Sequence, residues 1–269
     1  MSKVFITNEI LDHGMGSRVL KMINMYSYVE LLKSKGLDYE YIHTPLSYEG
    51  FGRNFTCNQL SLYYHKQLVN PREEYLQICR NWDNILKYDG KTVLEFGENN
   101  LTPHVFAGFN GENIGECFDF TRKIRTQIKD KFNIKKRTDF NKKVNIHIRR
   151  GDVTLDAHAD RYSSDEYYVK VIDKLKELYS DYTFTIHTQR RNFNETLFKG
   201  INLVYDDELN DYDAWLELIN SDVLIMSKSA FSYSAGALCD GLVIYPEDNM
   251  FHPKLYDWKK INELWKKQL

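Results

Sequence analysis

The chain has 269 residues and a formal net charge of −2. It is therefore long enough for one large domain or two small ones, and it carries no global field that would attract nucleic acid. Hydrophobic residues make up 42% of the sequence, yet no stretch approaches the roughly 20 apolar residues of a membrane span. The N-terminus also lacks the apolar run of a signal peptide. We therefore expect a cytoplasmic protein with no transmembrane segment and no nucleic-acid partner.

The first half of the chain opens as a parallel α/β unit. A strand is predicted at 4–6, a helix over 19–32 from apolar residues at helical spacing, and a second strand at 39–42. Further helices near 59–68 and 73–86, a strand at 92–96 and a helix over 118–132 are predicted next. The charged run at 134–143 reads as a linker, which gives an N-terminal domain of 1–140 and a C-terminal domain of 141–269.

The second half alternates strands and helices more regularly. Strands are predicted at 144–149, 183–187, 202–204, 223–226 and 242–246. Helices are predicted at 164–179, 212–220, 231–239 and 258–267, and the last of these is a candidate to pack back on the N-terminal domain. This alternation predicts a second α/β unit in tandem with the first. The cysteines (Cys57, Cys79, Cys117 and Cys239) are scattered, so we expect free thiols and no metal site.

The predicted strand at 144–149 ends in charged side chains. Side chains alternate along a strand, so Val144, Ile146 and Ile148 share one face while His147 and Arg149 share the other. In open α/β sheets ligands bind at the carboxyl ends of strands, and arginine forks match phosphate oxygens. The strand end therefore predicts an anion site at Arg149 and Arg150. The alternative is a strand end whose arginines form surface salt bridges.

Two other turns suit an anion. Ser229 and Ser232 surround the start of the helix at 231–239, where unpaired N–H groups attract negative charge; simple serine capping is the alternative. The loop Gly14-Met15-Gly16-Ser17-Arg18 is a weaker signal, because it lacks the third glycine of a dinucleotide fingerprint and the lysine of a phosphate loop. A tight strand–helix turn explains it equally well.

These segments together resemble a known family. His147-Ile148-Arg149-Arg150-Gly151-Asp152 resembles the His-x-Arg-Arg-Gly-Asp motif of the fucosyltransferases that make α1,2, α1,6 and protein O-linkages. The 14–18 loop looks like their Gly-x-Gly-Asn/Ser loop, and Ser229-Ala230-Phe231-Ser232 looks like their Ser-Ser-Phe-Ser segment. The resemblance is clear from about 144 to 246. It implies a GT-B-like α/β fold of two Rossmann-like domains with a cleft between them.

The resemblance also implies residue roles. Arg149 would contact the β-phosphate of the donor and His147 would approach its base or ribose. The nucleotide-sugar site as a whole would comprise Gly14, Gly16, Arg18, His147, Arg149, Arg150, Ser229, Phe231 and Ser232. One position departs from the family. The strand at 183–187 runs into Thr188-Gln189-Arg190, where these enzymes place an aspartate that reads guanine. The donor therefore stays open between a GDP-sugar and a UDP-sugar, and between fucose and another deoxysugar such as rhamnose.

The chemistry expected is glycosyl transfer to a glycan acceptor, with no cofactor and no metal. Arginines and a helix N-terminus neutralise a departing diphosphate without a divalent ion. The acidic runs at 206–208 and 211–213 abut a helix start, and we interpret them as capping charges. We expect an inverting reaction in which Arg149 stabilises the leaving group and a carboxylate such as Asp152 or Asp156 is the base. Asp152 as a structural partner of Arg150 is equally open.

Two other function classes compete. A non-catalytic protein that binds glycans or nucleotides would use the same arginine site. A phosphatase or kinase is disfavoured, because the chain lacks a phosphate-loop motif and a cysteine or aspartate nucleophile signature.

Overall fold

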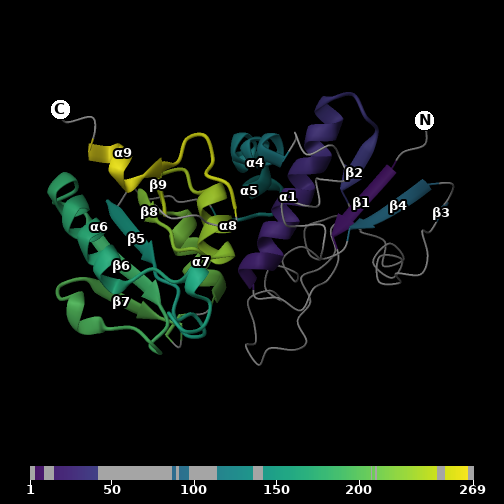
Figure 1. Ribbon diagram of the computed structural model, residues 1–269. Coiled ribbons are helices and arrows are strands. Elements are labelled where there is room, and N and C mark those ends of the chain that lie inside the picture. Colours follow the sequence, from purple (N-terminus) through teal and green to yellow (C-terminus); the bar gives the residue numbers. More distant parts are fainter. Residues whose placement is uncertain are drawn as a thin grey trace. The chain divides into compact units, whose positions relative to one another are not determined.

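The computed structural model describes residues 4–8, 15–41, 87–88, 91–96, 114–135, 142–206, 208–209, 211–246 and 252–265. It divides the chain into two compact units, Met1–Ile134 and Lys135–Leu269, which we call the N-terminal and C-terminal units (Figure 1). The helices predicted at 59–68 and 73–86 lie outside the described residues, as does most of the predicted linker at 134–143. Each unit is built on its own sheet, so the predicted α/β class is confirmed.

The N-terminal unit contains a four-stranded sheet in the order β2-β1-β4-β3. Its strands are β1 (Val4–Asn8), β2 (Tyr39–Tyr41), β3 (Lys87–Tyr88) and β4 (Lys91–Phe96). β1 pairs in parallel with β2 and β4, whereas β3 and β4 are antiparallel. The predicted strands at 4–6, 39–42 and 92–96 are therefore confirmed.

The helices of this unit follow the apolar spacing of the sequence. Helix α1 (Met15–Ser34) follows β1 in the chain and is followed by Gly36, whose φ of 82° is typical of a glycine just past a helix end. The single helix predicted over 118–132 is two helices, α4 (Ile114–Lys123) and α5 (Arg125–Lys131). They meet where the Arg122 carbonyl accepts a hydrogen bond from the Arg125 guanidinium at 3.0 Å. A side-chain donor at a backbone carbonyl competes with the helical bonding pattern.

The C-terminal unit contains a six-stranded sheet in the order β10-β9-β8-β5-β6-β7, and all its neighbours are parallel. Its strands are β5 (Lys143–His147), β6 (Thr183–Thr188), β7 (Asn202–Tyr205), β8 (Val223–Ile225), β9 (Leu242–Tyr245) and β10 (Lys259–Lys260). Its α-helices are α6 (Asp165–Leu178), α7 (Asp211–Ile219), α8 (Ala230–Leu238) and α9 (Ile261–Trp265). Two short 3-10 helices lie at Ala159–Arg161 and Glu195–Leu197.

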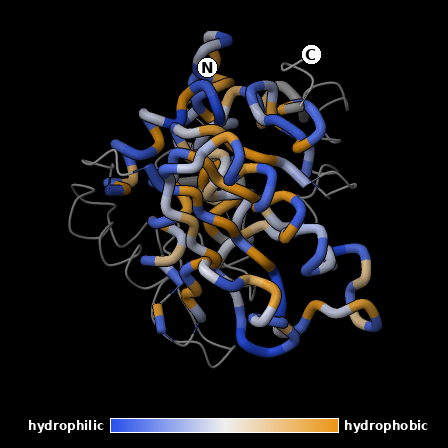
Figure 2. Tube along the Cα trace, turned by 90° about the vertical axis from the view of Figure 1, so that its left-hand side faces the viewer, coloured by the Kyte–Doolittle hydropathy of each residue, from blue (hydrophilic) through white to orange (hydrophobic). Residues whose placement is uncertain are grey.

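Helices cover both faces of this sheet. Figure 1 shows α6 on one side of the strands and α7 with α8 on the other. Val144, Ile146 and Ile148 are fully buried in one core with Val171 and Leu175 of α6. The opposite face is covered too, since a parallel sheet of this kind buries both faces. In Figure 2 the orange, hydrophobic stretches of the trace lie mostly toward its interior, and the outer turns are mostly blue and hydrophilic.

The end of the chain differs from its prediction. The helix predicted at 258–267 is replaced by strand β10 followed by the short helix α9. Lys259 and Lys260 pair in parallel with Ile244 and Tyr245 of β9, which ties this stretch to the sheet edge before α9 begins. Ile261 of α9 belongs to the core of the C-terminal unit, so this helix contributes to the packing of its own sheet.

Candidate functional site

The carboxyl ends of β5 and β8 bring the predicted site residues together. The two strands are parallel neighbours, with Ile146 opposite Ile225. β5 ends at His147, and β8 leads through Ser227 into α8. The Nδ1 atom of His147 lies 2.7 Å from the Ser227 hydroxyl oxygen, and the centroids of the His147 and Phe231 rings are 5.1 Å apart. The end of β5 and the 227–232 turn are therefore in contact in the structure.

His147 is held as a neutral ring. Burial lowers the pKa of His147 to about 3, with smaller contributions from the positive charge of Arg149 and from His187. His187 is its partner in register on β6, and burial lowers the pKa of His187 to about 4. The His187 Nε2 atom lies 3.3 Å from a Glu217 oxygen but is not aligned for a hydrogen bond, and its ring is uncharged at neutral pH. Two neutral rings thus lie side by side at this sheet edge.

The serines of the turn have distinct tasks. The Ser229 hydroxyl accepts a hydrogen bond from the Phe231 backbone N–H at 3.2 Å, so this serine caps α8 as the simpler alternative foresees. Ser232 is fully buried, and its hydroxyl donates to the Ser227 carbonyl at 3.1 Å. The Ser227 backbone N–H donates to the Ser232 hydroxyl at 3.2 Å. The expected approach of Ser229 and Ser232 to phosphates stays a prediction, and in the structure both hydroxyls hold the turn.

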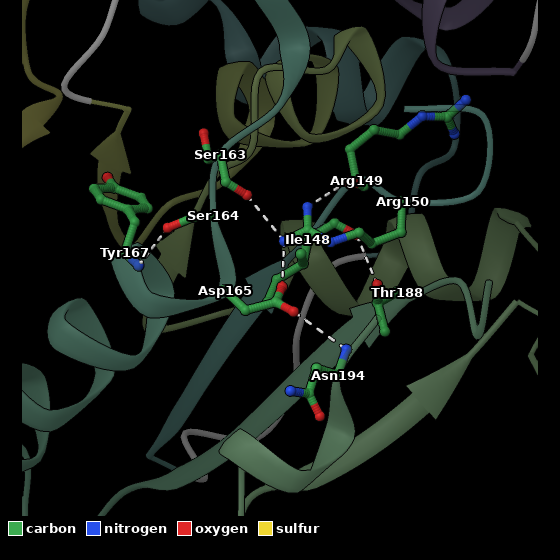
Figure 3. A network of polar contacts seen from close by, with 9 residues as sticks. All are labelled: Ile148, Arg149, Arg150, Ser163, Ser164, Asp165, Tyr167, Thr188 and Asn194. Carbon is green, nitrogen blue, oxygen red and sulfur yellow. Dashed lines mark hydrogen bonds and ion pairs between the residues drawn. The ribbon is translucent and has the colours of Figure 1, made fainter. Parts of the chain in front are cut away.

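The two adjacent arginines diverge, as Figure 3 shows. The Arg150 guanidinium forms a buried ion pair with Asp165, donates to the Ser163 carbonyl at 2.9 Å and donates to the Arg149 carbonyl at 2.8 Å. Arg150 is 1% exposed, whereas the Arg149 side chain points away from this network and remains 31% exposed. Of the two predicted phosphate ligands, Arg149 faces solvent and Arg150 is bonded inward.

The carboxylate after the arginines also has a defined partner. Asp152 forms an ion pair with Arg149, while Arg150 pairs with Asp165, so the alternative that joined Asp152 to Arg150 is wrong. Asp156, the other predicted base, is exposed on the loop that follows, as are His158 and Asp160. Gly151 makes the turn possible with a φ of 78°, a conformation that side chains disfavour.

The structure adds Gln189 to the site, a residue that sequence reasoning noted only for lacking a carboxylate. Its amide packs on Gly151, where an added Cβ would lie 2.7 Å from the Gln189 Oε1 atom. Its Nε2 donates to Asp206 at 3.2 Å, so a carboxylate lies beside Gln189 although it comes from the end of β7. Asp165 and His187 are further additions. The sequence signal for His187 is that the predicted strands at 144–149 and 183–187 both carry a histidine near their ends.

The predicted site residues of the N-terminal unit are less fully described. Gly14 lies outside the described residues. Gly16 is buried in the first turn of α1, and the backbone of Arg18 belongs to the same helix. A cavity of about 720 Å³ lies in this unit around the end of α1 and β2, and Tyr26, Tyr39 and Gln127 help to line it. None of the predicted site residues is among the described residues that line this cavity.

In the part of the chain that the structure describes, no group of three or more His, Cys, Asp or Glu side chains is placed to hold a metal ion. Asp211 and Asp213 lie in the first turn of α7, where carboxylates favour the helix dipole, in agreement with a capping role. Asp207 lies outside the described residues. Across those same ranges, none of the helices has the length and hydropathy needed to cross a bilayer.

Comparisons with known proteins find similarity in architecture. No protein-family model and no curated protein sequence matches the chain. E. coli heptosyltransferase WaaC with ADP-2-deoxy-2-fluoro heptose is similar at 9% identity over 98% of both chains, with a TM-score of 0.47. POFUT1 in complex with GDP is 10% identical over 89% of this chain and 95% of its own, with a TM-score of 0.41. E. coli ADP-heptose lps heptosyltransferase II is 10% identical over 96% and 89%, with a TM-score of 0.42. Likeness of this degree carries no inference about substrate or reaction.

Proposed function

We propose that this chain is a glycosyltransferase that moves a deoxysugar, fucose first among the candidates, from a nucleotide diphosphate sugar to a glycan acceptor. One observation carries the proposal. Arg149 is a partly exposed guanidinium two residues beyond His147, and His147 contacts both Ser227 and Phe231 at the start of α8. A cation, a helix N-terminus and an aromatic ring therefore gather at the carboxyl ends of adjacent parallel strands, which is where α/β sheets bind nucleotides.

The proposed division of labour follows from this geometry. Arg149 binds the diphosphate as a bidentate partner, and the N-terminus of α8 adds partial positive charge. Phe231 and the neutral His147 ring offer apolar and polar contacts to the base or ribose. The resemblance assigned Arg150 to the donor. In this proposal Arg150 instead supports Arg149, because its guanidinium donates a hydrogen bond to the Arg149 carbonyl at 2.8 Å. Gly14, Gly16 and Arg18 remain proposed contacts from the N-terminal unit.

The proposed reaction needs no metal and inverts the anomeric carbon. The acceptor oxygen forms a bond to that carbon, and the bond from the carbon to the phosphate oxygen breaks. The electron pair stays on the diphosphate, whose charge Arg149 neutralises, and the acceptor proton passes to a carboxylate of the 152–160 loop. Asp152 and Asp156 are the proposed bases. Rhamnose from a UDP or GDP donor is the alternative sugar, and cytoplasmic location stays part of the proposal.

Calorimetric titration with GDP and UDP tests the nucleotide site. We expect one of them to bind and Arg149→Ala to abolish that binding. Lys174→Ala is the matched control, because Lys174 is also a partly exposed cation in an ion pair, with Glu177 on α6. Lys174 lies nine residues, or roughly 13 Å, along α6 from its first residue, Asp165, which pairs with Arg150. Binding of neither nucleotide to the intact chain would refute the proposal.

Slow hydrolysis of the matching nucleotide sugar without acceptor separates an enzyme from the competing binding protein. We expect release of free sugar by the intact chain and none by Arg149→Ala. Tight nucleotide binding with no hydrolysis and no transfer to any glycan favours the binding protein. Loss of activity with a chelator, and its return with a divalent ion, contradicts the metal-independent part.

A further inference from the structure

Arg149, the proposed phosphate ligand, already has an anionic partner in the structure. Arg149 and Asp152 form an ion pair across the turn, three residues apart, and their side chains are 31% and 56% exposed. Arg150 beside it has a partner of a different kind, because its ion pair with Asp165 is buried. Arg150 is therefore bonded inside the fold, and Arg149 is paired where a ligand in solution can reach it.

We infer that the Asp152 carboxylate occupies the anion position on Arg149 when no donor is bound, and that the donor diphosphate displaces it. The displaced carboxylate then stands unpaired beside the bound donor, where it is the base for the acceptor hydroxyl. This inference rests on the proposed function and deepens it, because donor binding then raises the availability of the base.

The strengths of the two partners favour the exchange. An ion pair this exposed is worth at most about fivefold in an equilibrium constant, because water and salt screen it. A diphosphate brings more negative charge than one carboxylate, and its oxygens accept two parallel bonds from a guanidinium. Asp152 therefore competes with the donor weakly enough to be displaced and strongly enough for its removal to be measured.

The backbone around the pair is held on several sides, so the exchange needs only side-chain rotation. The Ile148 N–H donates to the His187 carbonyl at 3.0 Å, and Thr188 donates to the Ile148 carbonyl at 2.9 Å. The Gly151 N–H donates to the Arg191 carbonyl at 3.1 Å. Arg149 and Asp152 thus project from a fixed turn, and each can rotate without moving the strand end.

The exchange has a consequence at each end of the reaction. Before the donor binds, Asp152 is paired with Arg149 for part of the time, so donor binding makes its carboxylate more available to an acceptor. In the transfer step the acceptor proton passes to the freed Asp152 carboxylate while the diphosphate leaves on Arg149. Once Asp152 has lost this proton to solvent, it pairs with Arg149 again and so competes with the bound nucleotide product.

Asp152→Asn tests the exchange, because asparagine keeps the shape of the side chain and removes its charge. We expect GDP or UDP, whichever the intact chain binds, to bind this variant about two- to fivefold more tightly, since the competing carboxylate is gone. We expect its turnover to fall by about 10²- to 10⁴-fold, which is the usual contribution of a general base. A structural role alone would not tighten nucleotide binding while slowing turnover.

Glu177→Gln is the matched control, because it removes a carboxylate from another exposed ion pair of the same spacing, with Lys174 on α6. It should leave both nucleotide affinity and turnover unchanged. Equal or weaker nucleotide binding by Asp152→Asn, with an unchanged melting temperature, overturns the exchange. Tighter binding with normal turnover overturns the role of Asp152 as base. If neither the intact chain nor Asp152→Asn binds a nucleotide, the proposed function itself fails, and this pattern differs from both other outcomes.

Discussion

Arg150 and Asp165 form a buried ion pair that joins the end of β5 to the first residue of α6. Asp165 extends the connection, because its second carboxylate oxygen accepts a hydrogen bond from the Asn194 backbone N–H at 3.2 Å. Arg150 also lies over the Tyr162 ring, with its guanidinium carbon 4.7 Å from the centroid. The strand end, the loop after β6 and the start of α6 are thus tied together by one pair of side chains (Figure 3).

Breaking this pair should destabilise the fold. Arg150→Met leaves the Asp165 carboxylate uncompensated in the interior, and such a loss costs about 3–5 kcal/mol in the free energy of unfolding. Lys174→Ala is the control, because it breaks an exposed pair worth ~0–1 kcal/mol. Urea denaturation measures both, and the double variant Arg150→Met/Asp165→Leu should recover part of the loss. Equal effects of Arg150→Met and Lys174→Ala would contradict a structural role for Arg150.

Gly151→Ala should disturb the arginine turn through two separate effects. The φ of 78° disfavours any side chain, and the added Cβ would lie 2.7–2.8 Å from the amide of Gln189. Gly200 provides the matched control, because its φ is 76° and an added Cβ meets nothing within 4 Å. Gly200→Ala should cost only the backbone term of about 1–2 kcal/mol, and Gly151→Ala more. Thermal unfolding compares the two, and Gln189→Ala should relieve part of the Gly151→Ala effect.

The buried histidines should make stability fall on the acid side. His147 and His187 have pKa values lowered to about 3 and about 4, against an ordinary value of 6.5. The unfolded chain therefore takes up protons as the pH falls below about 6.5, while the folded chain does not until about 4. The histidine contribution to stability is complete above about pH 6.5 and is lost between there and about pH 3–4.

Thermal melts from pH 7 to pH 4 measure this loss. His187→Gln should flatten the dependence, because glutamine does not titrate, although the carboxylates of the chain contribute a slope of their own. An unchanged slope in His187→Gln would show that His187 is not kept neutral by the fold.

Ser227→Ala should weaken nucleotide binding. Its hydroxyl lies 2.7 Å from the His147 Nδ1 atom, and without it a buried ring nitrogen has no partner at that position. We expect a loss of about 1–3 kcal/mol in stability, the cost of an unmade buried hydrogen bond, together with a weaker nucleotide affinity. Ser27→Ala is the control, because Ser27 is a buried serine that donates to the Ile23 carbonyl within α1. Unchanged nucleotide affinity in Ser227→Ala would show that His147 does not shape the site.

Local patterns predicted most elements of the C-terminal unit. The helix at 164–179 is α6, with Ser164 as its N-cap, because apolar residues recur at helical spacing after a capping serine. The errors arise where tertiary contacts override local preference. Residues 259–260 pair with β9 instead of belonging to a helix, and nothing in the local sequence indicates this strand pairing.

The residues of the site were predicted from the sequence, and the contacts that hold them in place were not. His147 and the Ser227 turn lie together because parallel neighbouring strands present their carboxyl ends at the same side of the sheet. The sequence could not show that Ser232 bonds back to Ser227, about five residues away, or that Gln189 packs on Gly151, almost forty residues away. Both contacts depend on the conformation of the turns, which local residue patterns do not specify.

The sequence by itself determined the alternation of strands and helices, the apolar face of β5 and the concentration of charge at its end, because side-chain periodicity and residue chemistry are local properties. Only the tertiary structure decided between Arg149 and Arg150. Both carry the same guanidinium, and adjacent residues point in different directions. The packing of α6 over the strand end placed Asp165 against Arg150 and left Arg149 with the exposed Asp152.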